Sequence, residues 1–493
     1  MQKLETYIQN PLLIETAPTP TEEASTLDWD TVFAVSYDDI NSAIKKNKGC
    51  RPQKLICPPS GYFQFSIDAV FDDWQVIPGG DGATVHLLLP MTNMKAHYVL
   101  KGHPGTVTCD AMTMTVAVKL NLLPHKGAAK DADGTPLPPP AKGTTRHALR
   151  LRTTGTTPQD PIASIVNVDY VKPLSDPSAS SPIRTCLDNW VLTQIQTFEH
   201  IFAFVDLNDQ IDHGDFAFTK PVTTGYAVCD TIDKTSGMLA VLSMTSTDPA
   251  PAIQQVSSQA IPDGATAAFL IRRKRFLVDM IKPGLLHMWP NLRDDMLELS
   301  RDARSLRMKD GVSIMLPAVQ HNGDDYTPEL LSFDCKVSGN ELVVTTSTQV
   351  EVSTGIYGTC FSRTYYKLDV GKNKKGEQII TYSQSRKPSI QKGHWSKPGV
   401  EVAQTILTII AAVLGIVLIF LTDGAAAIVV AALLFAMIGH FAITNLQDDA
   451  LDAAPGLSEM VKHFTGAVIW TSRHMHITSS GLHGSLQLGG DFG

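Results

Sequence analysis

Histidines and carboxylates are spaced as possible metal ligands at two places in this 493-residue sequence. His474 and His476 stand two apart in a segment that alternates like a strand, so both imidazoles would lie on one face. No third ligand accompanies them, and a metal site normally needs three or four. Asp209, Asp212 and Asp215 could bind a hard cation, but acidic loops are usually just solvated. We therefore expect no metal site.

Known catalytic and cofactor motifs are missing from the sequence. The run from Asp131 to Gly134 resembles the opening of a calcium loop, but its twelfth position is Lys142, where a bidentate glutamate should stand. There is no glycine-rich phosphate loop, His-Glu-x-x-His, Gly-x-Ser-x-Gly or Cys-x-x-Cys. We expect no catalytic residue and no cofactor, and hence a protein that is not an enzyme.

The composition is that of a folded protein, with 43% hydrophobic and 18% charged residues. A net charge of -8 argues against nucleic-acid binding, which needs a concentrated basic surface. Seven cysteines fit no disulfide framework, so we expect reduced and mostly buried thiols. The N-terminus lacks the apolar stretch of a secretory signal. We expect synthesis in the cytoplasm, with any release or membrane association by another route.

Two helices with apolar stripes are predicted. The first covers residues 25–47, with Ser25 or Asp28 as its N-cap. Its stripe has spacings of four, three and four and consists of Phe33, Tyr37, Ile40 and Ile44. The second lies within residues 265–289 and ends at Pro283 and Gly284. Its stripe includes Phe269, Phe276 and Met280.

Strand patterns follow each predicted helix. Residues 111–123 alternate with a period of two over about twice the usual strand length, which predicts a large, strongly curved sheet. Shorter signals occupy residues 61–71, 83–91, 162–171, 226–232, 237–244, 340–355, 360–371 and 377–385, and a closing pair surrounds Ser479–Gly481. The order of a helix followed by strands occurs twice in the sequence, which indicates an internal duplication. We therefore expect a flexible tail over residues 1–24, a first domain over 25–250 and a second over 251–493.

Residues 405–444 form the most unusual segment. Two uncharged arms, in which His440 is the one ionisable residue, are joined by Thr422-Asp423-Gly424, which predicts an apolar helical hairpin over residues 402–446. Each arm could cross a hydrocarbon core of roughly 30 Å. Three alternatives remain: burial in the protein or under a partner, conditional membrane insertion, and a permanent anchor. The residues expected to contact membrane or partner are Ile410, Val413, Leu414, Leu418, Phe420, Val430, Leu433 and Phe435.

Three stretches resemble a known family. Residues 27–44, 267–286 and 479–490 are similar, in the same order, to signatures of the forty-seven-kilodalton and OrfX proteins encoded beside some clostridial neurotoxins. The resemblance implies the tubular lipid-binding (TULIP) superfamily. The expected fold class is then α+β, with two TULIP-like domains, each a long curved antiparallel sheet wrapped around a long helix, and the apolar hairpin inserted in the second.

Lipid binding is the function that this resemblance implies. Some of the apolar residues on the helices and the long strand would then line a lipid groove; the candidates are Phe33, Tyr37, Ile40, Ile44, Met112, Met114, Val116, Phe269, Phe276 and Met280. The expected partner is a lipid or membrane surface. The alternative is an accessory component of a multi-protein toxin assembly, in which the hairpin contacts protein partners or inserts into a membrane.

Overall fold

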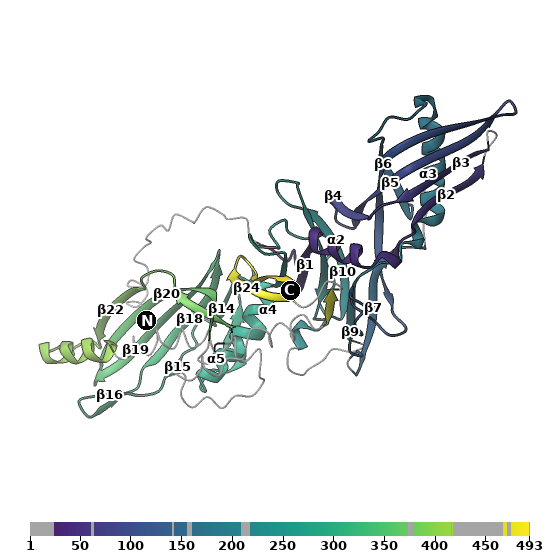
Figure 1. The fold of residues 1–493 in the computed structure, drawn as a ribbon. Helices are drawn as coiled ribbons and strands as arrows, with labels where there is room; N and C mark the ends of the chain where they lie inside the picture. The colour runs from purple at the N-terminus through teal and green to yellow at the C-terminus, as the bar shows by residue number, and fades with distance from the viewer. Residues whose placement is uncertain are drawn as a thin grey trace.

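The computed structural model describes residues 24–60, 64–140, 142–154, 160–208, 217–372, 376, 378–415, 417, 467–470 and 475–492. The described fold is mostly β, and all pairings between its strands are antiparallel (Figure 1). Two curled sheets are connected through a smaller central sheet.

The central sheet joins the two halves of the chain. Its order is β10 (Thr223–Asp230), β11 (Gly237–Met244), β1 (Thr31–Ser36), β12 (Ala267–Ile271), β25 (Leu486–Phe492) and β24 (Met475–Leu482). β1 and β12 pair antiparallel, with Ala34 opposite Ala268. The first half of the chain contributes β1 at the centre, with β11 and β10 outside it. The second half contributes β12 at the centre, with β25 and β24 outside it, so the two halves are arranged in mirrored order. This arrangement agrees with the predicted duplication.

The first predicted helix begins later than expected. Residues 31–36 form β1, and the helix α2 covers only Tyr37–Lys46. The side chain of Ser36, rather than Ser25 or Asp28, caps it by accepting from the backbone N–H of Asp39 at 3.3 Å. The prediction was wrong because β1 is buried on both faces, so its continuous apolar run matches a helix as well as a strand.

The second predicted helix also begins later than expected, and it extends beyond its predicted end. Residues 267–271 form β12, and the helical part is α4 (Arg273–Arg275), the π-helical turn η5 (Phe276–Ile281) and α5 (Lys282–Met288). The helix therefore does not end at Pro283 and Gly284. Pro283 lies in the first turn of α5, directly after the π-helical turn η5.

The first curled sheet confirms the long strand predicted from the alternation. β6 covers His103–Pro124 and buries Met112, Met114, Val116 and Val118 on one face. The order of the sheet is β2 (Lys54–Ser60), β3 (Phe65–Phe71), β5 (Thr84–Leu100), β6, β7 (Thr144–Leu151), β9 (Ile201–Asn208) and β23 (Val468–Trp470), with β4 (Gln75–Asp81) on β5 and β8 (Ala163–Asp169) on β6.

The second curled sheet repeats this pattern. Its order is β13 (Leu297–Leu299), β14 (Ser305–Met308), β18 (Glu329–Ser338), β19 (Glu341–Ser353), β20 (Ile356–Lys372) and β21 (Gln378–Gln384), with β15 (Ile314–Met315) on β18 and β22 (Ser389–Ser396) on β20. β20 pairs with β21 and β22 along one edge, as β6 pairs with β7 and β8. A separate hairpin joins β16 (Val319–His321) to β17 (Asp324–Tyr326).

Each series of long strands is followed by a helix. In the first half this is α3 (Ser180–Gln194), which the sequence analysis missed. In the second half residues 404–415 are helical. Residues 195–200 connect α3 to β9, whereas residues 416–467 stand between the second helix and β23. After its helix, the second half therefore has a long sequence that includes the rest of the apolar segment 405–444, where the first half has only a short connection.

The passage rich in proline, serine and glutamine before β12 packs onto the back of the central sheet. Val256 and Ala260 join a small apolar cluster there with Trp29 and Ala240. The amide of Gln487 on β25 donates to the backbone oxygen of Ala260 at 2.9 Å.

The turn of the closing strand pair is at residues 483–485 instead of Ser479–Gly481. Those residues belong to β24, next to a register shift in its pairing with β25.

Candidate functional site

The helix α3 fills one face of the first curled sheet (Figure 1). Its buried stripe consists of Ile183, Cys186, Leu187, Trp190 and Val191. The ring of Trp190 lies 5.2 Å from Phe71 and 6.4 Å from Trp74. The guanidinium of Arg184 donates to the backbone oxygen of Ile165 at 2.7 Å, which covers part of the open edge of β8. α3 therefore supports the sheet with its buried side, while its other side is exposed.

The ten groove candidates all lie in the apolar core that includes α3. Each exposes 3% or less of its surface, and the set is Phe33, Tyr37, Ile40, Ile44, Met112, Met114, Val116, Phe269, Phe276 and Met280. Phe33 and Phe269 meet edge to face at 5.8 Å where β1 and β12 pair. The structure thus brings these residues into one continuous interior, and their immediate neighbours are protein side chains.

The start of the apolar segment packs against the second curled sheet. Ile410, Val413, Leu414 and Val417 expose 5% or less and have the spacing of one helical stripe. A Cβ at Gly358 of β20 would lie 3.1 Å from Ile410 and 3.3 Å from Leu414, so the helix sits directly on this glycine. Val417 continues the stripe, although it is not among the residues predicted to contact membrane or partner.

The opposite side of this helix faces outward, and Thr405, Thr408 and Ala411 are exposed. The remaining hairpin candidates, Leu418, Phe420, Val430, Leu433 and Phe435, lie outside the described residues. Within the part of the chain that the structure describes, no helix has both the length and the apolar character needed to cross a bilayer.

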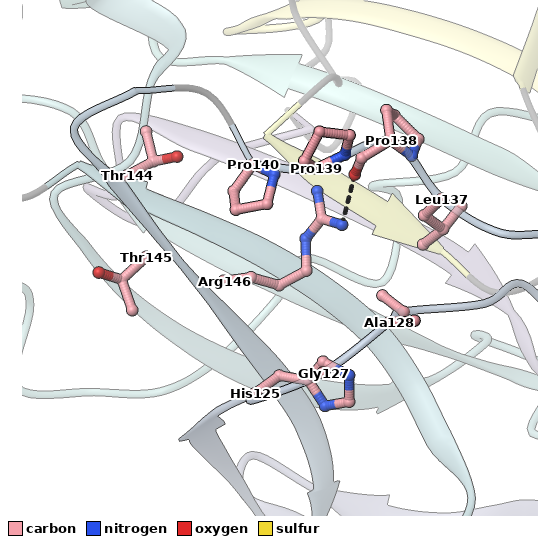
Figure 2. Close-up of a pocket in the computed structure, with 11 residues that line it drawn as sticks. His125, Gly127, Ala128, Leu137, Pro138, Pro139, Pro140, Thr144, Thr145 and Arg146 are labelled. Atoms are coloured by element: carbon pink, nitrogen blue, oxygen red, sulfur yellow. Dashed lines mark hydrogen bonds between the residues drawn. The ribbon is translucent and has the colours of Figure 1, made fainter.

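A cavity of about 490 Å³ lies beneath the proline-rich loop that follows β6 (Figure 2). Pro138, Pro139 and Pro140 form one wall. Arg146 holds this wall in place: two of its nitrogens are each 2.7 Å from the carboxylate of Asp206, and a third donates to the backbone oxygen of Pro138 at 2.7 Å. Because the guanidinium is fully paired, the cavity offers no free cation from Arg146. None of the ten groove candidates lines it.

The buried thiols of Cys50, Cys57 and Cys360 are unsuited to nucleophilic chemistry. Burial raises the pKa of Cys57 to about 12 and the pKa values of Cys50 and Cys360 to about 11. These thiols stay protonated at neutral pH, and the thiolate is the reactive form. Burial likewise raises the pKa of Tyr226 to about 12, and its hydroxyl donates to the backbone oxygen of Ala83 at 2.8 Å.

The possible metal ligands do not assemble among the described residues, which contain no group of three or more histidine, cysteine or carboxylate side chains suited to an ion. His476 is exposed, whereas His474 lies outside the described residues, as do Asp209, Asp212 and Asp215. The carboxylate of Asp131 accepts from backbone N–H groups of its own loop.

The fold is that of a protein made of two curled antiparallel sheets, each with a helix on one face, joined through a shared central sheet. The chain belongs to the OrfX-like family, described as "Protein OrfX2/OrfX3/P47", which matches residues 26–490.

Two relatives and two solved structures are similar over most of their length. Protein OrfX3 of Paraclostridium bifermentans is 28% identical, and Protein OrfX3 of Clostridium botulinum (strain Kyoto / Type A2) is 26% identical; each match covers 95% of this chain and 98% of the relative. P47 of Clostridium botulinum A2 has a TM-score of 0.63 at 14% identity, covering 96% of this chain and 99% of P47. P47 of Clostridium botulinum E1 has a TM-score of 0.60 at 13% identity, covering 94% and 99%.

The family match and the relatives place this chain among the OrfX and P47 proteins. At 13–14% identity, the two P47 structures establish a shared fold.

Proposed function

We propose that this protein is a non-enzymatic lipid- or membrane-binding protein of the TULIP type, with two TULIP-like units over residues 25–250 and 251–493. Its membrane-contacting part is the apolar segment 405–444. The observation that carries the proposal is the position of the helix 404–415, which buries one stripe on β20 and directs its other side outward. This helix anchors the segment to the second curled sheet at its first turns.

The driving force would be removal of apolar side chains from water, at about 25 cal/mol for each Å² buried. From Thr405 to Leu421 and from Ala425 to Ile443 the sequence offers no acidic or basic side chain other than His440 to oppose transfer into lipid. The alanines and glycines of both arms also permit packing against protein. Conditional insertion therefore fits the composition of the segment.

The family context supports a role without catalysis. Neither the protonated thiols nor the described carboxylates form an acid, base or nucleophile set in the cavity by the proline-rich loop. The relatives are OrfX3 and P47 proteins. Protein partners from a toxin assembly are the second candidate for what contacts the apolar segment, since an apolar stretch that folding leaves exposed marks an interaction site.

A vesicle flotation assay with Val430→Asp tests the proposal. Val430 lies within the second arm, and a charge there should oppose transfer into lipid, by about 2.5–3.5 kcal/mol if it reaches the bilayer centre. The matched control is Ile253→Asp, because Ile253 is 64% exposed and outside the segment. Val413→Asp is unsuitable, because Val413 is fully buried and a charge there would disrupt the packing of the helix 404–415 on β20.

Wild type and Ile253→Asp should float with the vesicles, and Val430→Asp should remain in the dense fraction. If the Val430→Asp variant floats normally but loses a co-purifying protein, the segment is a protein interface. If wild type does not float with vesicles of any tested composition, the membrane proposal fails.

A further inference from the structure

A buried histidine lies at the corner where the first curled sheet meets α2. His200 exposes 1% of its surface, and its Nδ1 is 3.8 Å from the Sγ of Cys50. Its ring meets Phe202 edge to face at 5.0 Å and lies 5.9 Å from Phe198. Its Nε2 is buried and has no hydrogen-bond partner among the described residues. The site fits a neutral ring and offers nothing that would stabilise an additional proton.

Three stretches of the chain are linked at this corner. The 3-10 turn η1 (Lys48–Cys50) ends at Cys50, whose backbone oxygen accepts from the N–H of Glu199 at 2.7 Å. The next residue, Arg51, pairs with Asp73 in the connection between β3 and β4, at 2.5 Å. The first stretch therefore holds both the start of β9 and the end of β3.

The charged groups near His200 would not compensate a positive imidazole. On the side of η1, Cys50 is a protonated thiol and Arg51 is a cation that is only 4% exposed in its side chain. Nε and Nη1 of Arg51 are buried without an acceptor in the described structure. From the β3–β4 connection Asp73 is already paired with Arg51, and from the β9 side Glu199 is exposed to solvent. A proton on His200 would place a second buried cation in this corner.

We propose that the corner formed by residues 48–51, 72–74 and 198–202 is an acid-sensitive joint, which opens when His200 takes up a proton at mildly acidic pH. Opening releases η1 from the start of β9 and exposes the imidazole to water. The joint connects α2, at the central sheet, with the sheet that contains α3. Acid thus loosens the attachment of the first curled sheet before the β-sheets themselves unfold.

The pH window follows from the burial of the imidazole. Burial lowers the pKa of His200 from 6.5 to about 3. Since the closed form disfavours the proton and the open form does not, stability is fully present above pH 6.5 and is lost as the pH falls toward 3. At pH 5 the opening equilibrium should be about 30-fold larger than at pH 7.5. Burial also lowers the pKa values of His86 and His483, which lie outside the three stretches of the joint.

Hydrogen exchange of the full chain, corrected for the intrinsic effect of pH, tests the joint. Between pH 7.5 and pH 5, backbone amides in residues 48–57 and 198–206 should lose protection by about 30-fold, whereas those of β18–β20 should change several-fold less. His200→Phe, which keeps an aromatic ring beside Phe202, should abolish most of the change. His97→Gln is the control, because His97 is exposed on β5.

Equal loss of protection in the joint and in β18–β20 would overturn the proposal. So would an unchanged response in His200→Phe. If that variant does not fold, the comparison of regions in the wild type decides the question without it.

Discussion

Replacing Trp190 by alanine should remove a central support of the first curled sheet. The indole is 4% exposed and packs against both Phe71 and Trp74. Deleting a buried tryptophan side chain costs about 3–5 kcal/mol, from lost transfer free energy and from the cavity that remains. We expect the first curled sheet to unfold at a lower urea concentration. The shift of the midpoint should correspond to that loss in the free energy of unfolding. Tryptophan fluorescence and circular dichroism would follow it.

The matched control lies two residues along the same helix. Leu192 is 53% exposed, so Leu192→Ala should change stability by less than about 0.5 kcal/mol. If Trp190→Ala costs no more than Leu192→Ala, α3 does not support the sheet and the reasoning is refuted.

Three further substitutions test other parts of the structure. Gly358→Val should collide with the helix 404–415, cost about 1–3 kcal/mol and increase proteolysis of that helix. Arg146→Met should leave the carboxylate of Asp206 buried without its partner and cost about 3–5 kcal/mol, measured by thermal unfolding. Burial raises the pKa of Asp279 despite the nearby Arg275, so its ionised form weakens the fold at neutral pH. Asp279→Asn should therefore be more stable than wild type at pH 7, and this advantage should shrink as the pH falls.

The first two substitutions have matched controls, and the third has an outcome that would contradict it. Thr359→Val changes the neighbouring residue of β20, whose side chain points to the other face, and should leave proteolysis unchanged. The double variant Arg146→Met, Asp206→Leu removes both charges and should recover part of the loss; no recovery would mean that the pair is not what holds the loop. If the advantage of Asp279→Asn grows toward acid pH, the assigned direction of its pKa is wrong.

The long strands were predictable because one face of each sheet is buried and the other is not. β6 and β19 show this alternation over most of their length, and the period of two is directly visible in the sequence. The central strands gave no such contrast. β1 and β12 are buried on both faces, so their apolar residues fitted a helical stripe that continued into the helices after them.

α3 could have been found. Its buried residues follow the helical spacing, and Asp176 with Pro177 marks the start of the preceding 3-10 turn. A helix on each curled sheet was predicted, but it was assigned to α2 and to the η5 region instead of α3 and residues 404–415.

The apolar stripes predicted burial correctly and could not predict more. Tyr37, Ile44 and Met280 are buried, as their spacing indicated. Whether a buried position faces another side chain or a ligand depends on the distance between elements, which periodicity does not encode. The packing of the helix 404–415 on Gly358 could not be predicted either. It depends on which strand residue lies under the helix, and the sequence pattern does not show this.

Lipid content of the purified protein tests the central claim most directly. The full chain, purified without detergent from cells that supply phospholipids, would be extracted with organic solvent and analysed by mass spectrometry beside an unrelated β-rich protein. The account predicts phospholipid above background with this protein and none above background with the control. Lipid at background level in both, together with no binding to added vesicles, would contradict it.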